Sequence, residues 1–508
     1  MRLDQRKMGV LLTYVSEAIK ILTTLVYTPV MLRLLGQSEF GLYQLVSTTV
    51  TYLSLLSLGF GSAYVRYHSK YHVKGDNAGI ARLNGMFMLV FCTMAAVCLV
   101  CGGVMTANIR LVFGDGLSAA EQSKAQILMA ILVVSMAVTF PNSVYTCYVT
   151  AHEKFIFQKL LIVVQNLLNP FLTLPLLLMG YGSVAVVMVS AVLTVVCFLV
   201  NVYYCGKHLR MQFSFRKLEF SLLLEMSVFT FFIFLNQIID QVNWNVGKFL
   251  LGRMTGTALV AVYGIGGQIN SLYVQMSTAV SSVFAPRVNR IVAETDDNSE
   301  LTDLMTKVGR IQFLILMPIL TGFLFFGRPF IQLWAGDGYE QAYEIALLLM
   351  IPVSVPMLQN LGIEIQRAKN LHRARSVMLT CLALCNVVLS IFMIRVWGAV
   401  GAAMGTAVAM VLGNVLFMNW YYHNRTGLDM RSFWMEIARF LPAMVLVCVF
   451  GAVYRHFVGI TGWMTLLISV AVYAAVYVAV MWCLGMNTYE KQLVRKMLSR
   501  LPGVKYHD

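Results

Sequence analysis

The chain has 508 residues, of which 59% are hydrophobic and only 12% are charged, and its formal net charge is +15. A soluble protein of this length has about a quarter of its residues charged and cannot hide so much apolar surface from water. The composition therefore excludes a soluble globular protein and indicates an integral membrane protein whose apolar surface is covered by lipid.

The apolar residues fall into blocks that are long enough to cross a bilayer as helices, since each crossing needs roughly 20 helical residues. The alternating pattern of membrane barrel strands is absent from the sequence, so an all-α polytopic fold is expected. We predict about fourteen transmembrane helices, near residues 8–32, 40–64, 83–106, 125–149, 158–180, 183–205, 221–250, 257–284, 311–334, 341–364, 376–396, 398–421, 434–457 and 462–486.

The first block is predicted to be an uncleaved membrane helix. It is too long for the apolar part of a signal peptide, and no small-residue cleavage site follows it. It also contains Glu17 and Lys20.

The ten cysteines are scattered through the apolar blocks, and the close pairs Cys98/Cys101 and Cys381/Cys385 lie within expected helices. Such cysteines are typical of small residues packed between helices rather than of metal or redox sites. We therefore expect no metal and no cofactor.

Most of the 38 Lys and Arg lie at the N-terminus, in the even-numbered loops and in the C-terminal tail. Positive residues near helix ends stay on the cytoplasmic side, so both termini are predicted to be cytoplasmic, in a multi-pass protein of the cytoplasmic (plasma) membrane. Topology and anionic lipid headgroups account for the positive charge, and nucleic acid is not an expected partner.

A weak internal repeat relates positions about 216 residues apart. Arg33-Leu34-Leu35-Gly36 corresponds to Phe249-Leu250-Leu251-Gly252. The repeat predicts two six-helix lobes related by a pseudo-twofold axis along the membrane normal, with two peripheral C-terminal helices. The expected organisation is an N-terminal lobe at 1–206, an amphipathic cytoplasmic linker at 207–220, a C-terminal lobe at 221–424, and helices 13 and 14 with a basic tail at 425–508. A plain connector is an equally good interpretation of the linker.

The expected seventh helix carries a broad polar face. Its polar side chains fall within roughly 200° of arc at 100° per residue, and they are Asn236, Gln237, Asp240, Gln241, Asn243, Asn245 and Lys248. A charged side chain at the bilayer centre costs about 2.5–3.5 kcal/mol, which predicts partners or water on this face.

The first helix shows the same feature, with Glu17, Lys20 and Tyr27 on its polar side. Because the first and seventh helices are equivalent in the repeat, their polar faces are expected to meet and to line a central aqueous cavity. The alternatives are a simple Glu17–Lys20 ion pair and amide contacts that only hold helices together.

Four segments resemble a known family: LLGQSEFGLYQL (34–45), LGFGSAYVRYHSKYHVKGDNAGIARL (58–83), FAPRVNRIVAE with the following SELTDLM (284–305), and VWGAVGAAMGTAVA (396–409). They are similar to the Wzx-like polysaccharide flippases of the multidrug/oligosaccharidyl-lipid/polysaccharide exporter superfamily. The resemblance implies two lobes around a V-shaped cavity and alternating access. It also implies transport of a lipid-linked oligosaccharide from the cytoplasmic to the outer leaflet, and no enzymatic activity.

A polyprenyl-diphosphate-linked glycan needs a cationic, hydrogen-bonding cavity. We expect Lys20 to hold the diphosphate, with Arg66 near the inner mouth, and Lys248 and Arg253 near the outer one. The amides on the seventh helix would meet sugar hydroxyls. No Walker A motif occurs, so the energy would come from an ion gradient (H⁺ or Na⁺, left open) or from removal of product. Asp240 and Glu17 are the candidate coupling carboxylates.

Three other functions compete with this hypothesis. A cation-coupled multidrug exporter would favour an acidic or aromatic cavity, whereas Lys20 and Lys248 suit an anionic cargo. A flippase for a peptidoglycan lipid precursor is a close variant. A scaffold subunit that works with other polysaccharide-assembly proteins would not need two polar helix faces.

Overall fold

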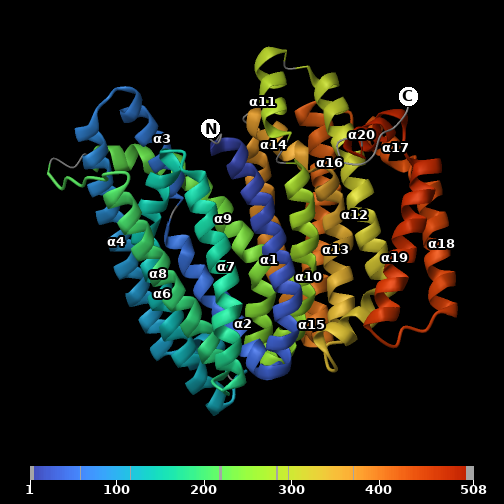
Figure 1. Ribbon diagram of the computed structural model, residues 1–508, viewed down its shortest axis with the longest axis horizontal. Coiled ribbons are helices and arrows are strands. Elements are labelled where there is room, and N and C mark those ends of the chain that lie inside the picture. The colour runs from blue at the N-terminus through green and yellow to red at the C-terminus, as the bar shows by residue number, and fades with distance from the viewer. Residues whose placement is uncertain are drawn as a thin grey trace. The chain divides into compact units, whose positions relative to one another are not determined.

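The computed structural model describes residues 5–57, 59–114, 116–216, 220–281, 284–295, 297–369 and 371–498. These residues form helices joined by short segments, and no strand occurs among them (Figure 1). The expectation of an all-α fold is confirmed.

Ten helices in the described ranges are long and apolar enough to cross a membrane, and an eleventh span is possible if α17 (Met430–Ala438) and α18 (Leu441–Phe457), bent by 42°, form one crossing. Each of the expected ranges overlaps at least one helix. The chain is therefore polytopic, and the total of fourteen spans stays a prediction.

The contacts divide the chain into two compact units. Unit 1 comprises Met1–Gly264 and Ile394–Ala402, and unit 2 comprises Ile265–Met393 and Ala403–Asp508. Helices α10 (Thr257–Ser281) and α15 (His372–Met410) each contribute to both units. This division follows spatial contacts rather than the sequence repeat, so the lobes, the linker at 207–220 and the pseudo-twofold axis stay predictions.

Unit 1 is built around long helices that pack side by side. α4 packs along α6, α6 along α8, and α1 along α7. Besides the start of α10, the elements are α1 (Gln5–Leu35), α2 (Gln37–Thr51), the 3₁₀ helix η1 (Tyr52–Ser57), α3 (Phe60–Val73), α4 (Asn77–Ala107), α5 (Ile109–Phe113), α6 (Ala119–Ala151), α7 (Phe155–Leu178), α8 (Gly182–Lys207) and α9 (Phe220–Met254).

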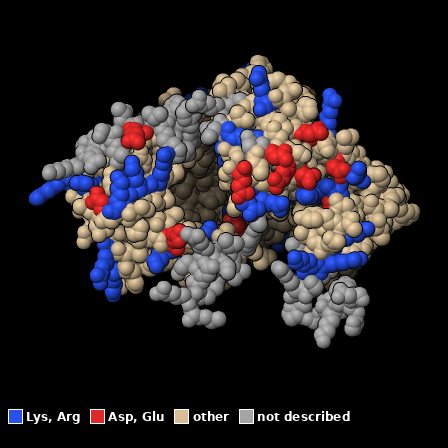
Figure 2. Space-filling view, turned by 90° about the horizontal axis from the view of Figure 1, so that it is seen from above, with Lys and Arg blue, Asp and Glu red and all other residues tan. Residues whose placement is uncertain are grey.

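Unit 1 has two ends at which its helices turn. The Gly36 end is the end at which α1 turns into α2, and the His152 end is the opposite one, at which α6 turns into α7. Gly36 has a φ of +73°, a backbone conformation that favours glycine, so it allows the sharp reversal after Leu35. Lys and Arg side chains, with some Asp and Glu, are spread over the face that includes the His152 end (Figure 2). That this face is cytoplasmic stays a prediction.

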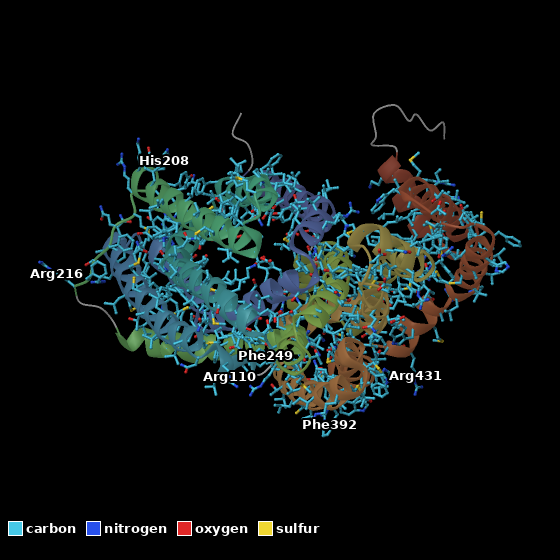
Figure 3. The ribbon with its side chains drawn as sticks, turned by 90° about the horizontal axis from the view of Figure 1, so that it is seen from below. Arg110, His208, Arg216, Phe249, Phe392 and Arg431 are labelled. Carbon is cyan, nitrogen blue, oxygen red and sulfur yellow. The ribbon has the colours of Figure 1, made fainter. Side chains whose placement is uncertain are left out.

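The segment after α8 is extended and lies on the start of α4. The Ser214 N–H donates to the Ala81 carbonyl at 2.9 Å, and Asn84 Nδ2 donates to the Gln212 carbonyl at 2.9 Å. Gly85 allows this approach, because a Cβ there would collide with the Ser214 carbonyl. Figure 3 labels His208 and Arg216, between which this segment runs. The described linker residues are therefore held on α4 by one backbone hydrogen bond and one side-chain hydrogen bond.

Unit 2 has a core centred on α12, against which α13, α17, α18 and α19 pack. Stacked rings of Phe313 and Phe440, with centroids 4.7 Å apart, lie in that core. The remaining elements are α11 (Ala285–Glu294), α12 (Asn298–Ala335), α13 (Gln341–Leu358), α14 (Asn360–Ala368), the π-helices η2 (Val411–Phe417), η3 (Tyr422–Thr426) and η4 (Met481–Gly485), α16 (Met418–Tyr421), α19 (Trp463–Val480) and α20 (Thr488–Leu498).

A buried ion pair attaches α20 to the core of unit 2. Arg310 of α12 donates to both carboxylate oxygens of Glu490, at 2.5 and 3.1 Å, and both residues are 3% exposed. The guanidinium also donates to the Glu436 carbonyl at 2.6 Å and lies 4.2 Å from the Phe440 ring centre. Because every face of this charge is satisfied, the amphipathic C-terminal helix is fixed at one place on α12.

Candidate functional site

The polar face of α1 changes from exposed to buried along the helix. Glu17 and Lys20 are both exposed. About three turns further on, the same face presents Thr28 and Met31, which are only 3% and 7% exposed. Tyr27 is half-buried and its hydroxyl is shielded from solvent. The face is therefore open in the half of α1 that lies toward the His152 end and closed near the Gly36 end.

Glu17 and Lys20 do not form an ion pair within the part of the chain that the structure describes. Each is a charged side chain on a membrane-length helix, and neither is buried against protein. Lys20 lies about 22 Å from Leu35 along the helix axis, inside the candidate membrane span Val15–Leu35, so its charge lies within the membrane. An exposed charge at that depth is stable in water and expensive in lipid.

The polar side chains of α9 are half-buried where they are described. Gln237, Gln241, Asn243, Asn245 and Lys248 all belong to this class. Asn245 Nδ2 donates to Gln241 Oε1 at 2.6 Å, one helical turn away. The other predicted residues of this face, Asn236 and Asp240, have side chains outside the described residues.

Lys248 is held close to α2. Its Nζ lies 3.5 Å from Gln44 Oε1, within reach of a weak hydrogen bond. Gly264 of α10 lies against the same Gln44 side chain. The described partner of the ammonium group is therefore an amide oxygen.

The two predicted arginines lie at opposite ends of unit 1. Arg66, on α3, and Arg253, in the last turn of α9, are both exposed. The Arg253 side chain lies beside Gly114, next to α5. Figure 3 shows Arg110 of α5 and Phe249 of α9 in the same part of unit 1, at the Gly36 end.

The polar faces of α1 and α9 belong to different helix pairs. α1 packs along α7 and touches α2 and α8, whereas α9 packs on α2, α3 and α5. The hypothesis that both faces line one cavity is compatible with this packing and stays a prediction.

A network of hydrogen bonds closes the Gly36 end of unit 1. Glu39 Oε1 lies 2.7 Å from the Lys124 ammonium and accepts the Ser183 N–H at 2.5 Å. Ser183 is in the first turn of α8, so this carboxylate joins the starts of α2 and α8 to α6. Gly182 has no Cβ to obstruct Glu39.

A second carboxylate, Glu121, extends the network to α10. Its Oε1 accepts hydroxyl donors from Ser38 at 2.8 Å and Thr257 at 2.6 Å, and these hydroxyls are 2.8 Å apart. Glu121 also forms a capping box with Ser118 at the start of α6. The starts of α2, α6, α8 and α10 are thus connected through two carboxylates.

Sequence reasoning missed Glu121, Lys124, Thr257 and Gln44 as members of this arrangement. The available signal was the segment 34–45, which carries Ser38, Glu39, Gly41 and Gln44 and was noted only for its family resemblance. The residues that contact one another here are far apart in sequence, and the sequence of an apolar helix does not show which other helix will pack against it.

In the described ranges no three His, Cys, Asp or Glu side chains are grouped so as to hold a metal ion.

Comparison with known proteins gives two sequence relatives. The chain is 22% identical over 491 residues to the uncharacterized membrane protein EpsK of Bacillus subtilis, a match that covers 94% of each chain. It is 23% identical over 169 residues to the probable flippase AglR of Haloferax volcanii, which covers 33% of this chain and only 35% of that protein.

Solved structures share the fold. A lipid II flippase MurJ in an inward closed conformation has a TM-score of 0.74 at 14% identity, covering 97% of this chain and 100% of that one. An inward-facing multidrug resistance MATE family transporter of the MOP superfamily has a TM-score of 0.57 at 13% identity, covering 82% and 99%. At these identities the likeness concerns the fold alone.

Residues 30–344, more than half of the chain, match the family described as polysaccharide biosynthesis protein. The chain belongs to this polysaccharide biosynthesis family and shares the helical fold of the MurJ and MATE structures.

Proposed function

We propose that the protein is a flippase that moves a polyprenyl-diphosphate-linked oligosaccharide from the inner to the outer leaflet of the cytoplasmic membrane, for cell-surface polysaccharide assembly. The family description and the name of the relative AglR, a probable flippase, support transport of a lipid-linked cargo. The charges and amides on α1 and α9 support an anionic, sugar-bearing cargo.

The observation that carries the proposal is the exposure gradient on α1. A lysine in lipid at mid-membrane costs about 2.5–3.5 kcal/mol, and this cost vanishes in water. Lys20 is exposed, while the same face is closed at Thr28 and Met31, and the Glu39 and Glu121 networks fasten the Gly36 end. On a helix that lines a transport chamber, this gradient is the one expected for one of the two states of alternating access.

Each group then has a role that follows from its chemistry. Lys20 and Lys248 would attract the diphosphate, and Gln237, Gln241 and Asn243 would hydrogen-bond sugar hydroxyls. Arg66 and Arg253 would act at the two mouths. Glu17 and Asp240 are the carboxylates through which H⁺ or Na⁺ could be coupled to the cycle.

The test is replacement of Lys20 by Ala in the natural host, with membrane insertion verified. Loss of a charged hydrogen-bond donor should reduce surface glycan about tenfold or more, with accumulation of the lipid-linked intermediate on the cytoplasmic side. Lys74→Ala, at an exposed residue just after α3, is the matched control and should leave export unchanged. Normal export by inserted Lys20→Ala protein would refute the assignment.

The similar solved structures are a lipid II flippase and a multidrug resistance transporter. A peptidoglycan precursor and a drug are therefore the two alternative cargoes to be tested beside the proposed glycan. Expression in cells depleted of their peptidoglycan-precursor flippase should not restore growth, and overexpression should not raise drug resistance. Restored growth would replace the proposed glycan by a peptidoglycan precursor, and drug resistance dependent on the α9 amides would replace it by a drug.

A further inference from the structure

Three histidines gather at the His152 end of unit 1, away from the polar faces of α1 and α9. His68 and His72 lie one turn apart on α3, and His152 caps the end of α6. The ring centre of His68 is 5.0 Å from that of His152 and 6.0 Å from that of His72, and the other two are 6.2 Å apart.

His68 is the unusual member of this cluster. It is only 1% exposed, and neither its Nδ1 nor its Nε2 has a hydrogen-bond partner in the described structure. A neutral imidazole has one donor and one acceptor, and burying both without partners costs free energy. Because burying His68 without hydrogen bonds does not stabilise the fold, its presence here calls for another explanation.

We propose that His68, His72 and His152 form a proton-binding site whose occupancy controls how α3 is seated against α6 and α9. The proposal does not depend on the identity of the cargo.

The tautomer of His152 identifies where a proton would bind on that ring. Its Nδ1 lies 2.9 Å from the Tyr148 carbonyl, which only accepts, so Nδ1 carries the hydrogen and Nε2 is free to take a second one. Tyr148 also lies edge-on to His68, with centroids 5.5 Å apart, and 4.2 Å from the His152 ring centre.

The surroundings of the cluster oppose a positive charge. The electrostatic neighbours of His68 are His152 and His72, and those of His152 are His72 and Lys154. The rings of Tyr64 on α3 and Tyr148 on α6 contact His68, and the electrostatic neighbours of Tyr64 are Cys147 and Tyr148 on α6 and Cys205 on α8. From α4, Asn84 and Phe87 contact Tyr64, and the Glu225 carboxylate of α9 accepts from Tyr67 on α3.

Protonation of the cluster therefore weakens the packing of α3 against α6. Burial lowers the pKa of His152; the Tyr148 carbonyl opposes this shift, and His72 and Lys154 reinforce it. A histidine whose pKa is lowered by packing binds its proton more readily when the packing opens. The packed form should thus be favoured above about pH 6.5, the ordinary histidine value, and weakened as the pH falls below it.

A contact on α3 transmits this change to α9. Tyr67, the residue before His68, donates its hydroxyl to Glu225 Oε1 at 2.8 Å. Glu225 lies on α9 about three turns before Gln237 and the other polar residues of that helix. Displacement of α3 away from a charged His152 would pull on this hydrogen bond.

Hydrogen–deuterium exchange on the full-length protein in lipid nanodiscs tests the proposal without any transport assay. After correction for intrinsic exchange rates, peptides from α3 and from residues 220–235 should exchange about fivefold faster at about pH 5.5 than at about pH 7.5. Peptides from α18 and α19 should not change. His68→Phe, which fills the aromatic surroundings, and His68→Gln should both abolish the acceleration.

His208→Gln is the matched control, because His208 is exposed in the same unit, stacks on Tyr204 and lies edge-on to Tyr203. It should retain the wild-type response to pH. An acceleration that persists in both His68 variants would overturn the proposal, as would one that is confined to α3 and never reaches residues 220–235. If a chelator at about pH 7.5 reproduced the acidic pattern, the cluster would bind a metal instead of a proton.

Discussion

The Gly36 end of unit 1 is held together by the carboxylates of Glu121 and Glu39 and by the lack of a side chain at Gly41. Glu121 and Glu39 each accept several hydrogen bonds, and a carboxylate that is shared by several donors fixes the helices that carry them. Gly41 has the opposite role. Its Cα faces the Thr257 carbonyl so closely that a Cβ would collide with backbone, and this approach brings Ser38 and Thr257 together.

We expect Gly41→Ala to separate α2 from α10 and to destabilise the protein by about 1–3 kcal/mol, the usual cost of overpacking. The measurement is the thermal unfolding midpoint of detergent-solubilised protein. Gly103→Ala is the matched control, since nothing lies within 4 Å of a Cβ there. That substitution should be neutral or slightly stabilising because alanine favours helix. Equal midpoints for wild type and Gly41→Ala would contradict the close approach.

At the scale of elements, α20 shows how a short amphipathic helix is attached. The Arg310–Glu490 pair is almost fully buried and fully hydrogen-bonded. Breaking such a pair leaves one charge without compensation, which typically costs 3–5 kcal/mol, whereas replacing both partners by apolar residues is often tolerated.

Arg310→Met should therefore lower stability by about 3–5 kcal/mol, and Arg310→Met with Glu490→Leu should regain most of the loss. Thermal unfolding of the two variants measures this difference. The same helix offers a control in Arg328, which pairs with Glu344 at 3.2 Å but is largely exposed. Arg328→Met should cost less than about 1 kcal/mol. A double variant no more stable than the single one would show that packing, not charge, is lost.

Helices were the most predictable part of this structure, because the thickness of hydrocarbon sets the length of an apolar block. The break in α15 is subtler: the helix runs from His372 to Met410, and only Gly398, at φ +55°, leaves helical geometry. Sequence placed a span boundary near that glycine. Composition could not show that residues 208–216 would hydrogen-bond to α4, since backbone pairing leaves no mark on side-chain pattern.

The sequence indicated which helix face carries the candidate site residues, but it could not indicate which residues of other helices they contact. Periodicity placed Glu17 and Lys20 on one face of a helix, because 3.6-residue spacing is a local property, and both are exposed on α1. It could not tell that Lys248 would lie beside Gln44 or that Glu121 would join Ser38 to Thr257, since each of these contacts depends on which helices become neighbours.

For the whole molecule, the distribution of Lys and Arg fixes an expected orientation. We predict that a green fluorescent protein fused after Asp508 fluoresces and that an alkaline phosphatase fused there is inactive, because the first folds in the cytoplasm and the second requires oxidation outside it. Fusions in the loop after α5 should give the reverse pattern. Active phosphatase at the C-terminus would invert the orientation and the direction of transport proposed above.

The burial of Glu490 determines where an affinity tag can be attached and which C-terminally truncated forms of the protein are stable. An affinity tag belongs beyond Leu498, where it leaves the carboxylate in place. A premature stop codon upstream of Thr488 would remove the closest counter-ion of the buried Arg310 guanidinium and leave the Glu436 carboxylate, at 3.6 Å, beside it. We expect membrane proteases to remove such a product soon after synthesis.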